Sequence, residues 1–332
     1  MEKPILGILL GDAAGVGPEI VAKVLVSGLL TESCRPVIIG DIRILEQGLE
    51  IIHAQYPHYT ITDPAQADWE KGIPVWNTGD QDPALVTMGR MSAYCGKGDI
   101  SQFHAACALC LDGSLQGFLY GPMHKGAMKE AGMAQESETE LIADLLGNAD
   151  PYGEINMLGN LMTVRVTSHI PISAVSAHLN IPDIMATIRL ARDTSRAFGV
   201  EAPRIAVSGL NPHNGENGKC GREELDIIAP AIELAQNEGW NVTGPYPADV
   251  VFMRAFRGDF DAVVTMYHDQ GQIALKSVGF DQGVTISGGQ PYPITTAAHG
   301  TAFGRAGQGR ASTTAFENAL KVLCRMAGNS AQ

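Results

Sequence analysis

The chain has 332 residues, of which 45% are hydrophobic, 6% aromatic and 18% charged, and 38 are glycine. This aliphatic composition excludes an intrinsically disordered chain, and the length corresponds to about two domains. The net charge of −13 disfavours nucleic acid as a partner, because an acidic surface repels phosphate backbones.

The first apolar run, residues 5–10, contains Gly7 and leads directly into Gly11-Asp12. It predicts a strand that enters a loop, and not a secretion signal. No run is long enough to span a membrane, so no membrane partner is expected. The six cysteines lack the spacing of a disulfide framework, and Cys107 and Cys110 are predicted to be buried thiols. Together these features predict a cytoplasmic protein.

Runs rich in Val and Ile recur along the chain and are separated by helical patterns. They are nearly continuous, as in strands covered on both faces, and they cover residues 5–10, 36–40, 117–120, 204–208 and 262–266. Apolar spacing of three and four residues, or Pro at the first helical position, predicts helices over residues 18–27, 181–198, 223–238 and 313–326. This alternation predicts an α/β fold.

Residues 155–158 and 161–167 flank Gly159-Asn160, a pattern that predicts a β-hairpin. An antiparallel pair within an α/β chain indicates a mixed sheet. No linker rich in Pro, Gly or Ser divides the chain into consecutive halves. We therefore expect two domains that share an extended interface, with the chain passing between them more than once.

Residues 11–20 read GDAAGVGPEI, a glycine-rich loop that follows a strand and opens a helix. The glycines permit a tight turn and a close approach of a ligand to the backbone, and the helix N-terminus favours an anion. The spacing matches neither the dinucleotide fingerprint nor the Walker A loop. A ligand-binding loop and a purely structural turn are both consistent with this pattern.

His169, His213 and His268 each follow a strand-like run. Ligands of open α/β sheets bind beyond the carboxyl ends of strands, where three imidazoles could hold a divalent metal. Asp249 and Asp269 are candidate carboxylates beside such a metal. No local spacing such as HExxH supports the set, so separate structural roles for the histidines are the alternative.

Two further features complete the candidate site. Lys276, eight residues after His268, could bind a substrate carboxylate or phosphate or move a proton, whereas a lone lysine is more often a solvated surface charge. Residues 299–309 read HGTAFGRAGQG, which indicates backbone packed against a flat ligand, with a mobile loop as the alternative.

Together these segments resemble the 4-hydroxythreonine-4-phosphate dehydrogenase family, within the wider isocitrate and isopropylmalate dehydrogenase-like group. The resemblance runs nearly end to end, and its NPHNGENG and YHDQG strings are specific. It rests on the opening loop, on YGPMHK at residues 120–125, on Ser168-His169, on GLNPHNGENG at residues 209–218, on YHDQG at residues 267–271 and on the loop after His299.

The resemblance implies an α/β fold of two interleaved domains, with a mixed sheet and a cleft between the domains. Residues 1–125 and 280–332 would form the dinucleotide-side domain. Residues 126–279 would form the domain for substrate, metal and dimerisation. The resemblance also implies a homodimer with a shared active site, a small-molecule substrate, and the family's place in pyridoxine biosynthesis.

The implied chemistry is oxidation of a secondary alcohol of a small hydroxy acid by hydride transfer to NAD or NADP, with decarboxylation where a carboxylate lies β to the new carbonyl. One divalent metal ion (Zn, Mg, Mn or Co) would bind His169, His213 and His268, with His268 contributed across the dimer interface, and would polarise the substrate oxygen. The general base stays open between Lys276, Asp249 and a metal-bound hydroxide, and Asp269 is a further catalytic candidate. The cofactor-binding residues that we assign are Gly11, Asp12, Gly15, Gly17, His299, Gly300, Thr301, Gly304, Arg305 and Gly307.

The substrate segment departs from the family pattern. The family's G-H-T-E appears here as S-E-T-E at residues 137–140, which makes Glu138 and Thr139 substrate-binding candidates. Thr285 stands where the family has Asn, and Ile294 stands where it has a phosphate-binding Arg, while Lys276 is retained. Loss of the Arg donors and gain of an acid predict that a phosphorylated substrate binds poorly.

The departure favours the first of three alternatives, and the other two belong to other functional classes. The chain could be a dehydrogenase for a non-phosphorylated substrate, such as a carboxylated cis-dihydrodiol. It could instead be a non-catalytic metal- or ligand-binding protein, or an acyltransferase on a related fold. Within the dehydrogenase reading, Gly304 replaces an Asp that accepts from the adenosine ribose and Arg305 follows it, which favours the 2′-phosphate of NADP.

Overall fold

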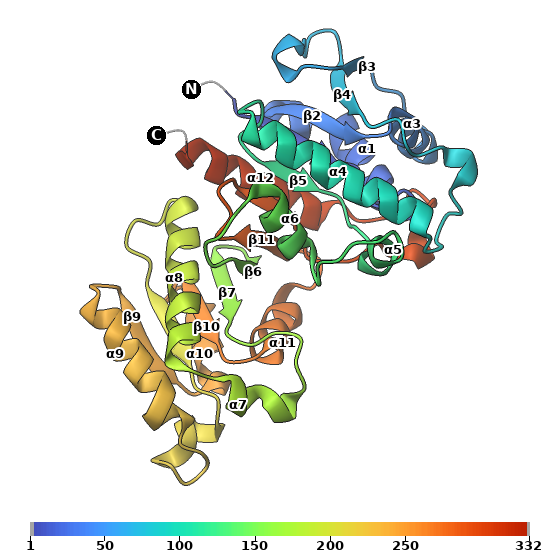
Figure 1. Ribbon diagram of the computed structural model, residues 1–332. Coiled ribbons are helices and arrows are strands. Elements are labelled where there is room, and N and C mark those ends of the chain that lie inside the picture. The colour runs from blue at the N-terminus through green and yellow to red at the C-terminus, as the bar shows by residue number, and fades with distance from the viewer. Residues whose placement is uncertain (1–2, 331–332) are drawn as a thin grey trace. The chain divides into compact units, whose positions relative to one another are not determined.

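The computed structural model describes residues 3–330, and the chain divides into two compact units (Figure 1). Unit 1 consists of Met1–Asp150 and Gln290–Gln332, and unit 2 consists of Pro151–Gly289. The chain therefore leaves unit 1 once and returns to it once, as expected for interleaved domains. No helix among the described residues is long and apolar enough to cross a membrane.

The observed boundaries differ from the predicted ones, because residues 126–150 belong to unit 1. Here α5 (Lys125–Glu130) and α6 (Glu138–Leu146) pack against α4 (Ala93–Leu111). Met128 of α5 and Ile142 of α6 are fully buried in the same hydrophobic cluster as residues of α4. This shared core, which residue composition did not reveal, moves the boundary beyond α6.

Unit 1 carries a parallel sheet with strand order β3-β4-β2-β1-β5-β12. Its strands are β1 (Ile5–Leu9), β2 (Arg35–Gly40), β3 (His58–Ile61), β4 (Ile73–Asn77), β5 (Phe118–Tyr120) and β12 (Ile294–Ala297). Its other helices are α1 (Gly17–Val26), α2 (Leu29–Ser33), α3 (Ile42–Ile51) and α12 (Thr314–Ser330), with short 3₁₀ turns at Pro64–Gln66, Pro83–Leu85 and Phe303–Arg305.

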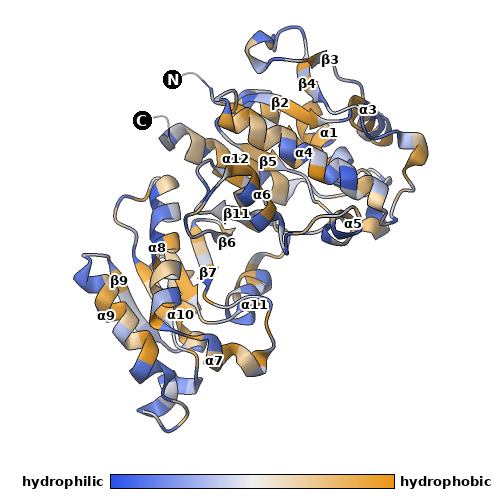
Figure 2. Ribbon diagram, in the orientation of Figure 1, coloured by the Kyte–Doolittle hydropathy of each residue, from blue (hydrophilic) through white to orange (hydrophobic). Residues whose placement is uncertain are grey.

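Helices cover both faces of this sheet, which explains the continuous apolar runs of its strands. Leu9, Phe118 and Ile294 point to one face and pack with α4 and α6. The alternating residues Leu6 and Ile8 are also fully buried, so the second face is covered too. Figure 2 shows β2 as a predominantly hydrophobic strand. Burial of both faces is the arrangement that parallel strands require.

The thiols predicted to be buried lie on α4, and the prediction is confirmed. Cys107 and Cys110 are both buried in the unit 1 core and are free thiols. Burial raises the pKa of Cys107 to about 12, because the thiolate loses its hydration in an apolar environment. These cysteines therefore act as small apolar side chains.

Unit 2 carries a mixed sheet with strand order β11-β6-β7-β10-β8-β9. Its strands are β6 (Gly153–Leu158), β7 (Leu161–Arg165), β8 (Ile205–Ser208), β9 (Val242–Tyr246), β10 (Ala262–Thr265) and β11 (Val284–Gly288). Its helices are α7 (Val175–His178), α8 (Ile181–Ala197), α9 (Ala229–Asn237), α10 (Ala248–Ala255) and α11 (His268–Gly279), with 3₁₀ turns at Ile172–Ala174 and Pro212–Glu216 and a π-helical turn at Glu224–Ile228.

The predicted hairpin is present in unit 2 and makes the sheet mixed, as expected. Strands β6 and β7 pair antiparallel across Gly159-Asn160, and β11 pairs antiparallel with β6. Strands β7, β10, β8 and β9 are parallel to one another. The carboxyl ends of β7, β10 and β8 therefore lie at one edge of the sheet, which is where His169, His268 and His213 follow in the sequence.

Candidate functional site

The opening loop, residues 11–17, joins β1 to α1 and is buried throughout. Gly11 has a φ of +82°, and a Cβ there would lie 2.8 Å from the Gly121 carbonyl carbon. A Cβ on Gly17 would lie 2.3 Å from the Leu10 carbonyl oxygen. Both positions require glycine, because neighbouring backbone occupies the space that a side chain would need.

A second loop, residues 299–311, covers the opening loop within unit 1. The Val16 amide donates to the Thr301 carbonyl oxygen at 3.0 Å, and a Cβ on Gly15 would lie 3.0 Å from Thr301 Cβ. The buried Glu19 carboxylate accepts backbone hydrogen bonds of 3.1, 3.3 and 3.1 Å from the amides of Gly307, Gly309 and Ala311. Glu19, which sequence analysis did not single out, thus anchors the second loop.

These contacts separate the predicted cofactor residues into two groups. Gly11, Asp12, Gly15 and Gly17 are buried, and they support the second loop from beneath. His299, Gly300, Gly304, Arg305 and Gly307 are exposed or half-exposed on the second loop, while Thr301 is buried. A Cβ on Gly300 or Gly304 would have no neighbour within 4 Å, so the second loop has an open outer face.

His124 adds a flat surface to the second loop. Its ring stacks on that of Phe303, with the ring centroids 4.9 Å apart and the planes 13° from parallel. His124 also caps α5, because its Nδ1 accepts a hydrogen bond of 3.1 Å from the Ala127 amide. In the neutral ring this leaves the proton on Nε2.

Two fully buried carboxyl groups, Asp12 and Asp99, lie beneath these loops. Asp12 accepts from the Ala14 amide at 2.8 Å, and Asp99 accepts from the His124 amide at 3.1 Å. Burial raises the pKa of both groups, and the Asp12 charge raises the pKa of Asp99 further. Sequence analysis missed this pair, because no local pattern marks Asp99.

In unit 2, His169 and His268 come together. Their ring centroids lie 5.8 Å apart at an interplanar angle of 45°. His268 begins α11 after β10, and its Nδ1 pairs with the Asp269 carboxylate at 2.7 Å. In such a pairing the other ring nitrogen, His268 Nε2, is the one that could bind a ligand. Two of the three predicted metal ligands therefore share one place in a single chain.

His213 lies apart from this pair, in a loop of left-handed backbone. Its φ is +52°, and Asn214 and Gly215 continue the run at +53° and +74°. The buried Glu224 carboxylate holds the loop, accepting from the amides of Leu210 and Asn211 at 2.8 and 2.6 Å. No group of three His, Cys, Asp or Glu side chains within residues 3–330 is placed to hold a metal. One chain thus brings together two histidines and not three.

The other predicted residues of unit 2 lie on α10, α11 and β11. Lys276 is exposed on α11, two turns after His268, and Asp249 is exposed in the first turn of α10. Thr285 of β11 is half-buried, and its hydroxyl accepts from the Asn156 amide group at 3.2 Å. A side-chain bond from Asn214 to the Pro245 carbonyl oxygen, 2.7 Å long, ties the His213 loop to the segment that precedes Asp249.

The predicted substrate residues of unit 1 mostly have structural partners. Ile294 is fully buried within the hydrophobic cluster, so it is a core residue and not a substrate contact, because its side chain points inward from β12. Thr139 is buried too, and its carbonyl oxygen accepts from Gln290 at 3.2 Å. Glu138 is half-buried in the first turn of α6, where an acid is favoured by the helix dipole.

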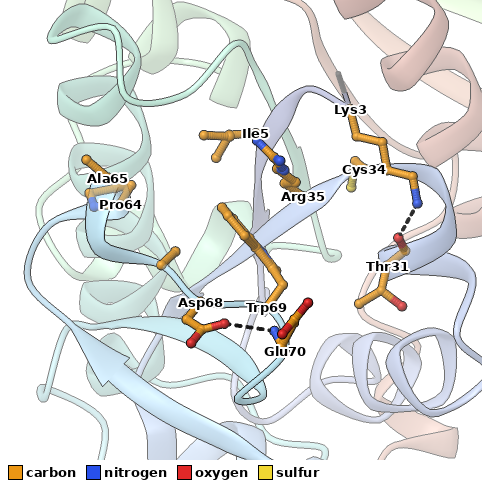
Figure 3. A pocket seen from close by; sticks show the side chains of 11 residues that line it. Lys3, Ile5, Thr31, Cys34, Arg35, Pro64, Ala65, Asp68, Trp69 and Glu70 are labelled. Atoms are coloured by element: carbon orange, nitrogen blue, oxygen red, sulfur yellow. Dashed lines mark hydrogen bonds between the residues drawn. The ribbon is translucent and has the colours of Figure 1, made fainter. Parts of the chain in front are cut away.

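A pocket of about 620 Å³ in unit 1 lies away from all these residues (Figure 3). It opens at the amino-terminal ends of β1 and β2, and Ile5, Arg35 and Trp69 line it. The Arg35 guanidinium lies over the Trp69 ring, 5.4 Å from its centroid. None of the residues that line the pocket is among those predicted to bind cofactor, substrate or metal.

Comparison with known proteins places this geometry in context. A family model described as pyridoxal phosphate biosynthetic protein PdxA matches residues 32–323. A relative from Pseudomonas aeruginosa is 42% identical over 99% of this chain and 98% of its own. A 4-hydroxythreonine-4-phosphate dehydrogenase from Desulforapulum autotrophicum is 39% identical over 98% of this chain and 96% of its own.

A solved structure agrees with the sequence matches. The 4-hydroxythreonine-4-phosphate dehydrogenase of Klebsiella pneumoniae superposes with a TM-score of 0.86 at 35% identity, over 98% of both chains. The resemblance read from the opening loop and the YHDQG string is therefore confirmed along nearly the whole sequence. This chain belongs to the PdxA family of pyridoxal phosphate biosynthetic proteins.

Proposed function

We propose that this chain is a metal-dependent dehydrogenase that oxidises a secondary alcohol of a small hydroxy acid with NAD or NADP. The observation that carries the proposal is the pair of rings of His169 and His268, 5.8 Å apart, with Asp269 behind His268. Family membership supports an enzyme acting on a CH–OH donor, because relatives over the whole length are named as such dehydrogenases.

The two histidines fit a divalent metal. Metal–nitrogen bonds of about 2.0–2.1 Å place two imidazoles on one ion with their centres roughly 5–6 Å apart, which matches the observed separation. Since structural and catalytic ions need further ligands, we assign the third position to His213. In a homodimer that ligand can come from either subunit. The family resemblance implies that His268 is the ligand contributed across the dimer interface, and we keep that assignment in the proposal.

Each residue then has a chemical role. A bound metal would polarise the alcohol oxygen as a Lewis acid. The hydroxyl proton would pass to Asp249 or Lys276, and the hydride on the carbon that bears the hydroxyl would pass to NAD or NADP. Lys276 follows His268 by eight residues, roughly 12 Å along the helix axis at 1.5 Å per residue. This spacing suits an ammonium that binds the far, anionic end of the substrate. We therefore assign Lys276 to substrate binding and Asp249 to proton transfer.

The substrate that we propose belongs to the class of the relatives, a four-carbon hydroxy acid carrying a terminal phosphate. This reverses our expectation that a phosphorylated substrate binds poorly, because relatives over the whole length are named for a phosphorylated substrate. Ile294 is a core residue, so Lys276 would carry the charge recognition of the phosphate. The comparisons do not favour a carboxylated cis-dihydrodiol. A terephthalate 1,2-cis-dihydrodiol dehydrogenase from Burkholderia xenovorans, 24% identical at a TM-score of 0.67, shares the fold alone.

The cofactor assignment rests on the second loop. Its outer face is open at Gly300 and Gly304, the imidazole of His299 is half-exposed, and Phe303 is held by His124. Arg305 is exposed beside Gly304, where a cation would favour a 2′-phosphate. We therefore expect NADP to be preferred over NAD. Equal or better kcat/KM with NAD would contradict this expectation.

We also propose a homodimer. The exposed side of α11 and the residue that follows it carry Ile273, Val278 and Phe280, which are 64%, 62% and 71% exposed. Met253 on α10 adds a further exposed apolar side chain. Exposed large apolar side chains such as these are typical of protein interfaces. Light scattering of the purified protein would show a dimer, and a monomer at micromolar concentration would contradict the proposal.

One assay tests the function directly. The nicotinamide absorbance is followed with 4-phosphohydroxythreonine, with its unphosphorylated form and with other hydroxy acids, each with and without a chelator. We expect turnover of the phosphorylated compound that stops with the chelator and returns with added metal. The absence of turnover with every alcohol would support a non-catalytic binding protein.

A further inference from the structure

Two thiols from opposite ends of the chain meet in unit 1, and no role proposed above uses them. Cys34 lies between α2 and β2, and Cys324 lies on α12, which packs against α2. Their side chains are hydrogen-bonded to each other. Nearly the whole sequence separates the two cysteines, so only the fold brings them together as a pair.

The fold covers one of these thiols and leaves the other accessible. Cys34 is 1% exposed, and its sulfur also lies 3.4 Å from the Leu30 carbonyl oxygen, which can accept a hydrogen bond from it. Cys324 lies on the same side of α12 as Leu320 and Ala327, which are at most 1% exposed. Its own side chain is partly exposed. A small reagent in solvent can therefore reach Cys324 first.

Their surroundings also give the two thiols different reactivity. The hydrogen bond from Cys34 lowers the pKa of the Cys324 thiol, because a donor stabilises the thiolate. The same bond, and then burial, raise the pKa of the Cys34 thiol, and the charge of Lys3 opposes this rise. Figure 3 shows the Cys34 sulfur beside the Lys3 side chain. Since the thiolate is the nucleophile, Cys324 is the more reactive thiol of the pair.

The other cysteines lack this combination of proximity and access. Cys107 and Cys110 are close in sequence, but both are buried in the core of unit 1, and burial raises the pKa of each. Cys95 is buried as well. Cys220 is exposed, but it is the only cysteine among residues 151–289, so unit 2 contains no second thiol to pair with it.

We propose that Cys34 and Cys324 form a reversible disulfide when the protein meets a low-molecular-weight disulfide such as glutathione disulfide. The Cys324 thiolate attacks one sulfur of the reagent, whose S–S bond breaks and releases one glutathione thiolate. Cys34, on losing its proton, then attacks the Cys324 sulfur of the mixed disulfide and releases the second glutathione thiolate. The two protein thiols thus give up two electrons and two protons, and glutathione disulfide is reduced to two glutathione molecules.

This bond would fasten α12 to the segment that precedes β2. α12 already packs against β12, where the Thr295 hydroxyl donates to the Ala319 carbonyl oxygen at 3.1 Å. A covalent link between residues so far apart in sequence restricts the unfolded chain strongly. We therefore expect the oxidised protein to melt about 3–10 °C above the reduced protein.

Controlled oxidation followed by mass spectrometry tests the proposal. The reduced full chain is treated with glutathione disulfide until Cys220 carries the mixed disulfide, and the remaining thiols are then alkylated in denaturant. We expect a cross-linked peptide that contains Cys34 and Cys324, lighter by two hydrogens than its two parts together. Dithiothreitol should separate the parts again. Cys107 and Cys110 should be recovered in the alkylated form.

Two variants serve as a matched pair. Cys324→Ser should abolish both the cross-link and the rise in melting temperature while Cys220 still reacts, whereas Cys220→Ser should retain both. Alkylation of both Cys34 and Cys324 after Cys220 has reacted would overturn the proposal, as would a lasting glutathione adduct on Cys324 beside a reduced Cys34. A cross-link without a rise in melting temperature would refute the fastening of α12.

Discussion

The carboxyl groups of Asp12 and Asp99 are both fully buried, and each keeps one oxygen without a hydrogen-bond partner within residues 3–330. The pKa of Asp99 is raised mainly by burial and then by the charge of Asp12, and burial is the main cause of the raised pKa of Asp12. Two neighbouring buried carboxyls cannot both ionise at low cost. The pair therefore holds a proton more tightly in the folded protein than in the unfolded chain.

Asp99→Asn should stabilise the protein at neutral pH. Because the pKa of Asp99 is higher in the folded state, its contribution is most favourable below the unfolded pKa and is lost as the pH rises through the folded pKa. An amide keeps the acceptor for the His124 amide and has no charge to bury. We expect a gain of about 1–3 kcal/mol in the free energy of unfolding, measured by urea denaturation, and a smaller gain in acid.

The exposed Asp150 offers a control, since Asp150→Asn should leave both the stability and its pH dependence unchanged. If Asp99→Asn were instead less stable than the unaltered protein at neutral pH, the carboxyl would be ionised and well compensated. That result would contradict the retained proton.

Glu19→Gln should loosen the second loop. The Glu19 carboxylate accepts three backbone hydrogen bonds from Gly307, Gly309 and Ala311. In glutamine an NH2 group replaces one carboxylate oxygen, and this group cannot accept a hydrogen bond from a backbone N–H. Hydrogen bonds to charged groups contribute about 1.5–3 kcal/mol each, so we expect a loss of about 2–4 kcal/mol in stability. Amide hydrogen exchange should speed up at residues 299–311 before it does elsewhere.

The same variant tests the cofactor assignment of the second loop. We expect KM for the dinucleotide to rise more than kcat falls, because the loop must be ordered before it can bind. Glu130→Gln, at an exposed position on α5, is the control. An unchanged dinucleotide KM together with faster exchange in the loop would separate the loop from the cofactor.

Asp269→Asn should weaken metal binding without unfolding the protein. The Asp269 carboxylate pairs with His268 Nδ1 at 2.7 Å and is itself exposed, so its loss affects the orientation of the imidazole more than the core. A 10–100-fold lower metal affinity is expected, measured by competition with a chromogenic chelator. The exposed Asp281 gives the control Asp281→Asn. Equal affinity in both variants would mean that Asp269 does not orient His268.

Local patterns predicted the elements, but not every turn within them. The apolar spacing of residues 223–238 predicts one continuous helix, whereas the structure has a π-helical turn at Glu224–Ile228 followed by α9. Pro230 explains the difference, because its ring lacks an N–H and crowds the carbonyl four residues earlier, which widens the turn. The helix was thus predictable from periodicity, and its irregular start required attention to one proline.

The site was predictable where chemistry sits at strand ends and not where it depends on distant partners. The position of His169, His213 and His268 after parallel strands predicted that all three would meet, and within one chain only His169 and His268 do so. The anchoring roles of Glu19 and Glu224 could not be predicted from the sequence. Each carboxylate accepts hydrogen bonds from backbone amides of a loop, and no local pattern around the glutamate identifies that loop as its partner. The direction of Ile294 also needed the strand register, since alternate residues of a strand point to opposite faces.

Ile294→Arg tests the corrected place of Ile294. A position in a phosphate site would accept the arginine and gain affinity for phosphorylated substrates. Ile294 is instead fully buried among apolar side chains such as Phe118 and Leu9, where an unpaired guanidinium has no partner. We expect a loss of more than about 4 kcal/mol in stability and no gain in phosphate affinity. Ile294→Val should cost only about 0.5–1.5 kcal/mol, as measured by thermal unfolding. A stable Ile294→Arg protein with a lower KM for 4-phosphohydroxythreonine would return this residue to the substrate site.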